Sequence, residues 1–236
     1  MIRFYAPDIT ATGQLPADDS THCVRVLRRR VGDSVEVVDG RGNLYHCRLT
    51  DDNPRGASVE IVETSLLPKV WQPKITVAVA PTKNADRIEW LVEKLVEIGV
   101  DRIVPVRCAR SERKDIKAER LHRIAVSAMK QSLKAVLPVI EETMPLKAFL
   151  DEPASGQRFV GYCDDNTPRL NLARAYTPNQ DVSLLIGPEG DFSPEEIEHA
   201  LKTGFIAVTM GDNRLRTETA ALVAACTIHT INQLNS

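Results

Sequence analysis

The sequence predicts an α/β protein with a small β domain over residues 1–70 and a larger domain with a mostly parallel sheet over residues 71–236. In the first 65 residues, polar and apolar side chains alternate with a period of two, which is typical of half-buried strands. After residue 73, short apolar runs alternate with helical stripes, the pattern of a parallel sheet with crossover helices. A connector that contains prolines, residues 66–73, separates these two sequence patterns and marks the boundary between the domains.

The predicted elements of the first domain are three strands and one short helix. Residues 34–38 alternate as a strand, and the Asp-Gly-Arg-Gly turn at 39–42 leads into a second strand over 44–50. Residues 58–62 form a third strand, and a short helix is expected near 18–27. These elements predict a small barrel or curled sheet.

The second domain is predicted to alternate strands and helices along its length. Strands are expected at 75–80, 102–106, 158–162, 182–186 and 206–209, and helices at 84–98, 117–132, 193–202 and 217–234. The first of these helices is expected to end at Gly99, because glycine adopts the conformation that closes a helix.

Composition excludes several classes of protein. Hydrophobic residues make up 43% of the chain, enough to bury a core, yet no apolar run approaches the roughly 20 residues of a membrane span. The chain begins without the apolar segment of a secretory signal, so a cytoplasmic location is expected. The five cysteines and five histidines show neither C-x-x-C nor H-x-x-x-H spacing. We therefore expect reduced thiols and no metal site.

Charge is unevenly distributed along the chain. Residues 70–134 carry 14 basic and 8 acidic residues, whereas residues 135–236 carry 7 basic and 14 acidic ones. The basic excess is densest over 107–134, and a second cluster contains Arg25, Arg28, Arg29 and Arg30. This asymmetry favours a polyanionic partner such as a nucleic acid, with a solvated helix face as the alternative.

The most informative segment is the Gly-Pro-Glu-Gly loop at 187–190. It follows a buried strand, and open parallel sheets bind ligands at the carboxyl ends of their strands. Ser193, Pro194 and Glu196 then match the N-cap, first position and capping box of a helix. The segment lacks the lysine of a P-loop and the spacing of a dinucleotide site. The loop is interpreted as a ligand-binding loop, with a tight strand-to-helix turn as the alternative.

A second segment, residues 210–221, again follows a strand and opens a helix. Arg216, Thr217, Glu218 and Thr219 place polar groups at a helix N-terminus, where backbone N–H groups are unpaired. The structural alternative is that Thr217 caps the helix and Arg216 forms a surface ion pair.

Together, Ile186–Gly190 and Leu215–Ala220 resemble the 16S ribosomal RNA uridine-N3 methyltransferases of the SPOUT, or trefoil-knot, superfamily. The similarity covers the whole chain: residues 3–5 and 22–28 resemble the PUA-like domain of that family, residues 93–100 resemble its first long helix, and residues 111–113 and 129–132 match its middle section. In one departure, Leu133-Lys134 stands where many members have Gly-Arg, so the turn loses a glycine and a bidentate contact.

The resemblance implies a PUA-like β-barrel RNA-binding domain, a C-terminal trefoil knot and S-adenosyl-L-methionine bound in the knot. The implied cofactor-binding residues are Leu185, Ile186, Gly187, Pro188, Glu189, Gly190, Met210, Gly211, Leu215, Thr217, Thr219 and Ala220. The end of the strand predicted at 158–162, with Tyr162 and Cys163, is implied to form another wall of the cofactor site. The implied substrate is one uridine of 16S rRNA near the decoding centre of the small ribosomal subunit. A homodimer is also implied, with the final helix contributing through Leu222, Ala225, Ile228 and Ile231, or else packing these residues in the core.

Residue roles follow as hypotheses. Arg216 is expected to stabilise negative charge on the uracil carbonyl oxygens. Glu218 is a candidate proton acceptor, with orientation of Arg216 or helix capping as alternatives. The residues expected to contact RNA phosphates are Arg3, Arg25, Arg28 and Arg30 in the small domain, and Arg110, Arg113 and Lys130 in the larger one.

Three other functions compete with this prediction. One is a non-catalytic RNA-binding or ribosome-assembly protein, which would keep the basic clusters without cofactor affinity. Another is a nucleotide-dependent enzyme, against which the absence of a lysine or metal carboxylates near the Gly-Pro-Glu-Gly loop argues. The third is a SPOUT enzyme with a different RNA target.

Overall fold

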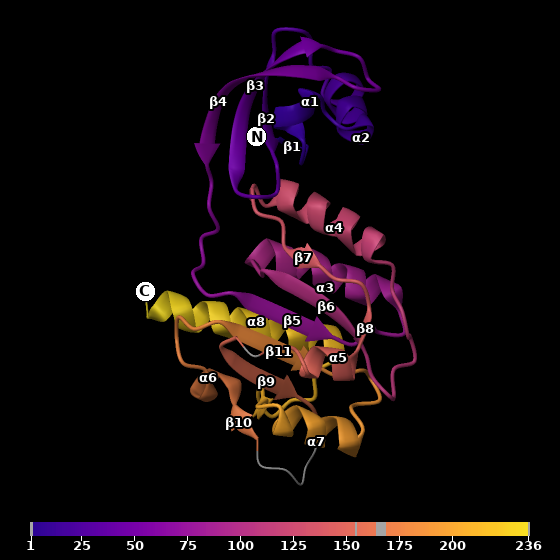
Figure 1. Ribbon diagram of the computed structural model, residues 1–236, viewed down its shortest axis with the longest axis vertical. Helices are drawn as coiled ribbons and strands as arrows, with labels where there is room; N and C mark the ends of the chain where they lie inside the picture. Colours follow the sequence, from indigo (N-terminus) through magenta and orange to yellow (C-terminus); the bar gives the residue numbers. More distant parts are fainter. Residues whose placement is uncertain (1, 154, 164–168, 236) are drawn as a thin grey trace. The chain divides into compact units, whose positions relative to one another are not determined.

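The computed structural model describes residues 2–153, 155–163 and 169–235. The chain divides into two compact units, which are described separately (Figure 1). Unit 1 contains the residues up to Val70 together with Val126–Leu137, and unit 2 contains Trp71–Ala125 and the residues from Pro138 onwards. Residues 126–137, which the sequence analysis assigned to the larger domain, thus pack with the smaller unit.

Unit 1 is built on a four-stranded sheet in the order β1-β2-β3-β4. Its strands are β1 (Arg3–Tyr5), β2 (Ser34–Val38), β3 (Asn43–Asp51) and β4 (Ser58–Leu66). Strand β1 pairs parallel to β2, whereas β2–β3 and β3–β4 are antiparallel. Two register shifts interrupt the β3–β4 pairing, and bulges of this kind bend a strand and increase its twist. The sheet therefore curls, as the sequence predicted.

The helix predicted near residues 18–27 is present, but its second half is a π-helix. Helix α1 (Ile9–Thr12) comes first, then α2 (Ala17–Thr21), which continues directly into η1 (His22–Val26). The Leu27 N–H donates to the carbonyl of His22, five residues back, and Arg28 then takes a positive φ of 56°. The wider turn presents Arg25, Arg28 and Arg30 on the surface.

Buried Asp39 fixes the turn between β2 and β3. Its carboxylate accepts hydrogen bonds from the backbone N–H groups of Arg41 and Asn43, and from the Asn43 side chain. Burial alone would raise the pKa of Asp39, but these hydrogen bonds outweigh it and hold the pKa below its usual value.

The second segment of unit 1 contains the departure at Leu133. Leu133 has a φ of 54°, a region where side-chain-bearing residues are strained and glycine is not. The glycine that many family members carry at this turn suits that backbone conformation. Nearby, Lys130 forms an ion pair with Asp19, which occupies its ammonium group within unit 1.

Unit 2 contains an extended parallel sheet in the order β10-β12-β9-β11-β5-β6-β7. Its strands are β5 (Ile75–Val79), β6 (Arg102–Arg107), β7 (Val139–Ile140), β9 (Gln157–Gly161), β10 (Leu170–Asn171), β11 (Val182–Ile186) and β12 (Ile206–Thr209), and β8 (Met144–Pro145) pairs with β6. The five strands predicted for this domain are present. Because β9, β11 and β12 are neighbours and parallel, their carboxyl ends lie at one edge of the sheet.

Among the residues that the structure describes, six helices belong wholly or partly to unit 2. They are α3 (Ala85–Ile98), α4 (Ala118–Gln131, whose second half belongs to unit 1), α5 (Leu146–Leu150), α6 (Leu172–Ala175), α7 (Pro194–Lys202) and α8 (Thr217–Leu234). Asn84 caps α3, and Gly99 ends it as predicted, with a φ of 106°. Sequence patterns missed α5 and α6 because each is only about one turn long.

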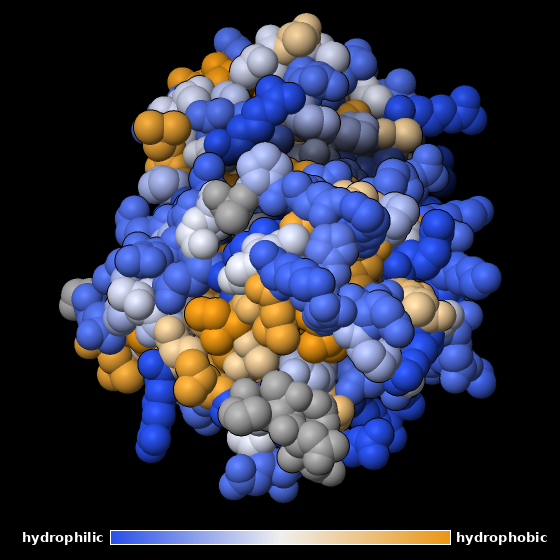
Figure 2. All heavy atoms as spheres, turned by 60° about the horizontal axis from the view of Figure 1, so that its bottom comes forward, coloured by the Kyte–Doolittle hydropathy of each residue, from blue (hydrophilic) through white to orange (hydrophobic). Residues whose placement is uncertain are grey.

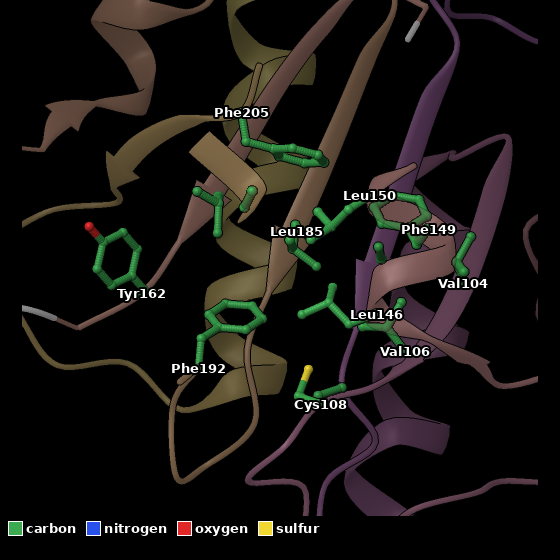
Figure 3. Close-up of a cluster of buried hydrophobic side chains, with 14 of the residues drawn as sticks. Val104, Val106, Cys108, Leu146, Phe149, Leu150, Tyr162, Leu185, Phe192 and Phe205 are labelled. Carbon is green, nitrogen blue, oxygen red and sulfur yellow. The ribbon is translucent and has the colours of Figure 1, made fainter. Parts of the chain in front are cut away.

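The two faces of the parallel sheet bury different helices. Helices α3 and α8 contact each other, and α8 also packs on β5 and β11. Helices α5 and α7 also contact each other. Residues of both belong to a cluster of buried side chains, called the second core cluster to distinguish it from the packing of α3 and α8, which includes Leu185, Phe149, Phe192 and Phe205 (Figure 3). Side chains alternate between faces along a strand, so consecutive residues of β11 serve the two different cores.

Buried Arg158 joins the ends of two helices beneath this second core. Its guanidinium donates to the carbonyls of Thr203 at 3.0 Å, Leu150 at 3.1 Å and Phe149 at 3.4 Å. It also lies 4.2 Å from the centre of the Phe205 ring. One side chain thus supplies donors to carbonyls at the ends of both α5 and α7, among them those of Leu150 and Thr203.

Candidate functional site

A cavity of about 900 Å³ opens at the carboxyl ends of β9, β11 and β12. Its walls come from three segments: the end of β9, the Gly187–Asp191 loop after β11, and residues 208–220 at the end of β12 and the start of α8. The volume falls within the range of pockets that hold a drug-sized ligand. The sheet topology therefore brings together two sequence motifs that are about 25 residues apart.

The cavity has an apolar part and a polar part. Ile186, Val208, Met210 and Leu215 contribute hydrophobic surface, whereas residues 211–214 contribute backbone and polar side chains. On the face of the molecule drawn in Figure 2, hydrophobic residues gather in a patch that hydrophilic residues surround. A ligand with an aromatic ring and a charged or hydrogen-bonding end would match such a lining.

The helix after the loop begins as the sequence predicts. The Ser193 side chain accepts from the Glu196 N–H at 3.3 Å, and the Glu196 carboxylate accepts from the Ser193 N–H at 2.8 Å, which completes the capping box. The other Glu196 oxygen accepts from the Ala109 N–H at 2.7 Å. The start of α7 is thereby bound to the segment that follows β6.

Hydrogen bonds to three other segments hold the Gly187–Asp191 loop. The Thr217 hydroxyl donates to the Gly187 carbonyl at 3.0 Å. The Glu189 carboxylate accepts from the backbone N–H of Lys83 at 3.0 Å, and the Asp191 carboxylate accepts from that of Cys163 at 2.9 Å. A loop fixed in this way is preorganised for a ligand, because little conformational entropy remains to be lost on binding.

Close packing makes Gly187 itself necessary. A Cβ atom at this position would lie 2.8 Å from Cε2 of the Phe192 ring, closer than side chains normally approach. Phe192 is buried in the second core cluster, so its ring has little room to move away. This glycine therefore serves to accommodate an aromatic ring beneath the loop.

Arginines line the cavity as well. Arg110 donates to the Gly190 carbonyl at 3.4 Å, and Arg169 donates to the Tyr162 carbonyl at 2.6 Å. Arg214 of the lining and Arg216 beside it are exposed, and neither has an ion-pair partner among the described residues. These cationic groups suit an anionic substrate.

The cavity includes most of the predicted cofactor-binding residues. Those that line it are Ile186, Gly187, Pro188, Glu189, Gly190, Met210, Gly211, Leu215, Thr217 and Ala220, with Tyr162 and Cys163. Leu185 does not, because strand alternation turns its side chain into the second core cluster. Thr219 also lies outside the lining, two residues along α8 from Thr217.

The two predicted catalytic residues lie beside the cavity rather than in its lining. Arg216 is the N-cap residue of α8, between Leu215 and Thr217, and its side chain is exposed. Glu218 is buried, and its carboxylate lies 3.8 Å from the guanidinium of Arg87 on α3. One carboxylate oxygen is therefore directed toward α3, and the other has no hydrogen-bond partner among the described residues, so the role of Glu218 as proton acceptor stays a prediction. Thr217, the alternative helix cap, instead donates its hydroxyl to Gly187.

The structure separates the predicted RNA-contacting residues into two groups. Arg25, Arg28, Arg30 and Arg110 are exposed. Arg3, in contrast, is buried and donates to Glu36 and to the Leu133 carbonyl, which corrects its assignment to the RNA surface.

Two further basic residues of this set already have partners. Arg113 donates to the carbonyls of Thr82 and Lys83, and Lys130 is paired with Asp19. Both therefore help to hold the fold, as does Arg30, which pairs with Asp52 at 3.4 Å, and the contact of these residues with RNA stays a prediction.

Sequence reasoning missed Asp191 and Arg169 of the lining. Asp191 directly follows the Gly-Pro-Glu-Gly loop, so its place beside the motif was a usable signal. Arg169 offered none, because only the fold brings the segment after β9 to the cavity.

The donor set suits S-adenosyl-L-methionine better than a metal ion. Hydrophobic side chains next to exposed backbone groups match an adenosine, and acidic Asp212 lies in the lining for a cationic ligand. Within the described ranges, no cluster of three or more histidine, cysteine, aspartate or glutamate side chains has the arrangement of a metal site. Across the same residues, none of the helices has the length and apolar character needed to cross a bilayer.

Comparison with known proteins assigns the chain to a family. Residues 70–229 match the RNA methyltransferase domain family, and residues 15–62 match the RNA methyltransferase PUA domain family. A ribosomal RNA small subunit methyltransferase E of Aquifex aeolicus is 31% identical over 83% of this chain and 85% of its own length.

Solved structures agree with this assignment. A probable rRNA methyltransferase of Porphyromonas gingivalis is 46% identical, with a TM-score of 0.95 over the full length of both chains. A ribosomal RNA small subunit methyltransferase E of Neisseria gonorrhoeae, bound to S-adenosyl methionine, is 29% identical, with a TM-score of 0.85 over 98% of both chains. The chain described here therefore belongs to the ribosomal RNA small subunit methyltransferase E family of RNA methyltransferases, and combines a PUA-type domain with the α/β domain of that family.

Proposed function

We propose that this protein transfers a methyl group from S-adenosyl-L-methionine to N3 of a uridine in 16S rRNA of the small ribosomal subunit. The observation that carries the proposal is the cavity in which the Gly-Pro-Glu-Gly loop and the start of α8 face each other. The names of the related proteins support the rRNA substrate, and the solved relative bound to S-adenosyl methionine supports the cofactor.

When bound, S-adenosyl-L-methionine supplies an electrophilic methyl group and its own leaving group. The protein therefore has to bind the two reactants and align them. We propose that Ile186, Met210 and Leu215 contact the apolar part of the cofactor and that backbone groups of Gly187–Gly190 and Gly211 bind its polar part. The fixed loop then holds the methyl donor in one orientation.

The uracil side of the reaction needs a cation. Uracil N3 carries a weakly acidic proton, which we propose passes to Glu218 or to solvent, and its loss places negative charge on the carbonyl oxygens beside it. We propose that Arg216, exposed at the N-terminus of α8, stabilises that charge. The target base has to be unpaired or rotated out of a helix to expose N3.

We propose two RNA-contacting surfaces, each within one unit. In unit 1 the exposed arginines of the segment after η1, Arg25, Arg28 and Arg30, contact phosphates. In unit 2 exposed Arg110 does so at the edge of the cavity. Folded rRNA is recognised largely through its shape and backbone, so such contacts position the substrate without reading its sequence.

We also propose that the protein is a cytoplasmic homodimer with a C-terminal trefoil knot. Small ribosomal subunits, the proposed substrate, are found in the cytoplasm. On α8, Ala225 and Ile228 are buried within the chain, so the dimer contact would come from half-buried Leu222 and Ile231. Sedimentation across a dilution series, with activity measured in parallel, tests the dimer.

The decisive experiment is methyl transfer from labelled S-adenosyl-L-methionine into small subunits from cells that lack this protein, followed by nucleoside mass spectrometry. We expect 3-methyluridine. Another methylated nucleoside would refute N3 of uridine as the target. Cofactor binding without methylation of the subunit would favour a different RNA, and the absence of binding would favour a non-catalytic assembly factor.

The Arg216→Gln variant tests the proposed role of the arginine. It removes the charge and keeps a side chain of similar length, so we expect turnover to fall by roughly 10²–10³ with cofactor affinity unchanged. Normal turnover of this variant would refute the role.

A further inference from the structure

The three walls of the cavity are joined by two hydrogen bonds from side chains to backbone. The Thr217 hydroxyl, at the start of α8, donates to the carbonyl of Gly187 at 3.0 Å. The Asp191 carboxylate, at the end of the loop, accepts from the N–H of Cys163 after β9 at 2.9 Å. Each bond therefore links the loop to a different wall.

Asp191 adopts a conformation that suits this role. Its φ is 59°, in the left-handed region that aspartate tolerates better than most residues. One carboxylate oxygen accepts from the N–H of Phe192 at 2.8 Å, and the other from Cys163. Its own N–H donates to the Pro188 carbonyl at 3.0 Å, which closes the turn of the loop. Both carboxylate oxygens are thus engaged with backbone groups.

Thr217 makes the corresponding contact on the other side of the loop. It is buried, and it is the first residue of α8. The hydroxyl group carries a single proton, which is directed at the Gly187 carbonyl. The hydroxyl therefore fixes how closely the start of α8 approaches the loop.

We propose that Asp191 and Thr217 are positioning residues: they set the affinity of the cavity for S-adenosyl-L-methionine by fixing its three walls relative to one another. This inference rests on the proposed function, because it takes the cavity as the cofactor site. Without either bond the loop samples other positions. The apparent affinity for the cofactor is then reduced in proportion to the fraction of time that the loop spends in the binding-competent position.

Two pairs of variants separate positioning from loss of fold. Asp191→Gly removes the carboxylate and suits a positive φ. Asp191→Asn keeps one oxygen that accepts from Cys163 and gives up only the second bond, to the neighbouring Phe192 N–H, which does not link two walls. Thr217→Val removes the hydroxyl at nearly constant shape, whereas Thr217→Ser keeps it. We expect the Gly and Val variants to bind S-adenosyl-L-methionine roughly 2- to 12-fold more weakly, the fold-change of one hydrogen bond, and the Asn and Ser variants to bind nearly as wild type.

Matched controls are available elsewhere in unit 2. The Thr227 hydroxyl donates to the Val223 carbonyl within α8, so Thr227→Val removes an equivalent group from the same helix. The Asp181 carboxylate accepts from the N–H of Lys74 at 2.7 Å, at the opposite end of β11, so Asp181→Ala removes a similar bond far from the cavity. Neither control is expected to change cofactor affinity.

A direct contact between Asp191 and the cationic sulfonium is the competing explanation. S-adenosylhomocysteine lacks that charge, so calorimetric titration with both ligands separates the two roles. Positioning predicts that Asp191→Gly weakens both ligands by the same factor. If Asp191→Asn weakens S-adenosyl-L-methionine but not S-adenosylhomocysteine, or if both the Gly and Val variants bind as wild type does, the proposal is overturned.

Amide hydrogen exchange of the free protein provides a readout that does not depend on the cofactor. We expect the Cys163 amide to exchange faster in Asp191→Gly than in wild type or Asp191→Asn, with global unfolding unchanged. Equal exchange in all three would overturn the proposed contact. If the wild type binds neither ligand, the proposed function fails, and positioning is decided by this exchange measurement alone.

Discussion

Replacing Gly187 with alanine should strain the interior beneath the loop, and the structure gives the size of the effect. A Cβ at this position would lie 2.8, 3.0 and 3.2 Å from three atoms of the Phe192 ring. The ring is buried beside Leu185, Leu146 and Cys108 (Figure 3), so it moves only by disturbing them. Overpacking of this kind typically costs about 1–3 kcal/mol. For a chain of this length, each kcal/mol lowers the melting temperature by roughly 2–4 °C.

Tryptophan fluorescence during urea unfolding measures this cost, because Trp71 and Trp90 both belong to unit 2. Gly190→Ala is the matched control in the same loop: its nearest neighbours are the Arg110 Cβ and carbonyl oxygen, both at 3.3 Å. We expect this control to cost less than about 1 kcal/mol, because smaller shifts relieve a contact of that length.

A second substitution tests the steric origin directly. Phe192→Leu removes the far edge of the ring, so its own cost should be partly recovered when it is combined with Gly187→Ala. We expect a favourable coupling of about 1 kcal/mol or more between the two positions. If Gly187→Ala is as stable as wild type, or if the two costs simply add, the steric explanation is wrong.

Four other predictions follow from buried or strained groups. Arg158→Met should destabilise unit 2 by about 2–4 kcal/mol in urea unfolding, because it leaves the Leu150 and Thr203 carbonyls at the ends of α5 and α7 unpaired. Stability equal to wild type would contradict this. Leu133→Gly should be about 1 kcal/mol more stable than Leu133→Ala in thermal unfolding, because only glycine relieves the positive φ, and the reverse order would show that the turn is not strained. N-ethylmaleimide should modify exposed Cys163 before the buried thiols, since burial raises the pKa of Cys108 to about 12. Because Cys163 lines the cavity, S-adenosyl-L-methionine should slow its labelling in a mass-spectrometric time course. Unchanged labelling would place the cofactor elsewhere. The stability that Asp39 contributes through its lowered pKa is present above about pH 4 and is lost as the pH falls through the lower, folded-state pKa. The difference between the urea midpoints of wild type and Asp39→Asn should therefore become smaller as the pH is lowered from 7 to 3.

Periodicity and capping signals in the sequence identified most elements of the fold. The capping box at Ser193 and Glu196 and the glycine that ends α3 depend on neighbours within a few positions, so a local pattern was sufficient to predict them. Strands such as β5 and β11 were predictable because their apolar runs are flanked by turn residues. The two C-terminal motifs located the cavity, since each follows a strand that ends at the same edge of the sheet.

Contacts between distant segments were beyond such patterns. Local sequence gave no indication that Arg3 would be buried against Glu36, or that Glu218 would lie beside Arg87. Both outcomes depend on which element packs beside the residue. Periodicity also predicts no threading of the chain, because it describes each segment alone.

The sequence by itself determined the order of the longer strands and helices, the two glycine- and polar-rich motifs, and the family to which they belong. The tertiary structure alone decided which side chains of those motifs line the cavity and which hold its walls. Asp191 and Thr217 illustrate the difference: their hydrogen-bond partners lie 28 and 30 residues away along the chain. Hydrogen bonds act over about 3 Å of space irrespective of sequence separation, so only the folded chain brings such groups together.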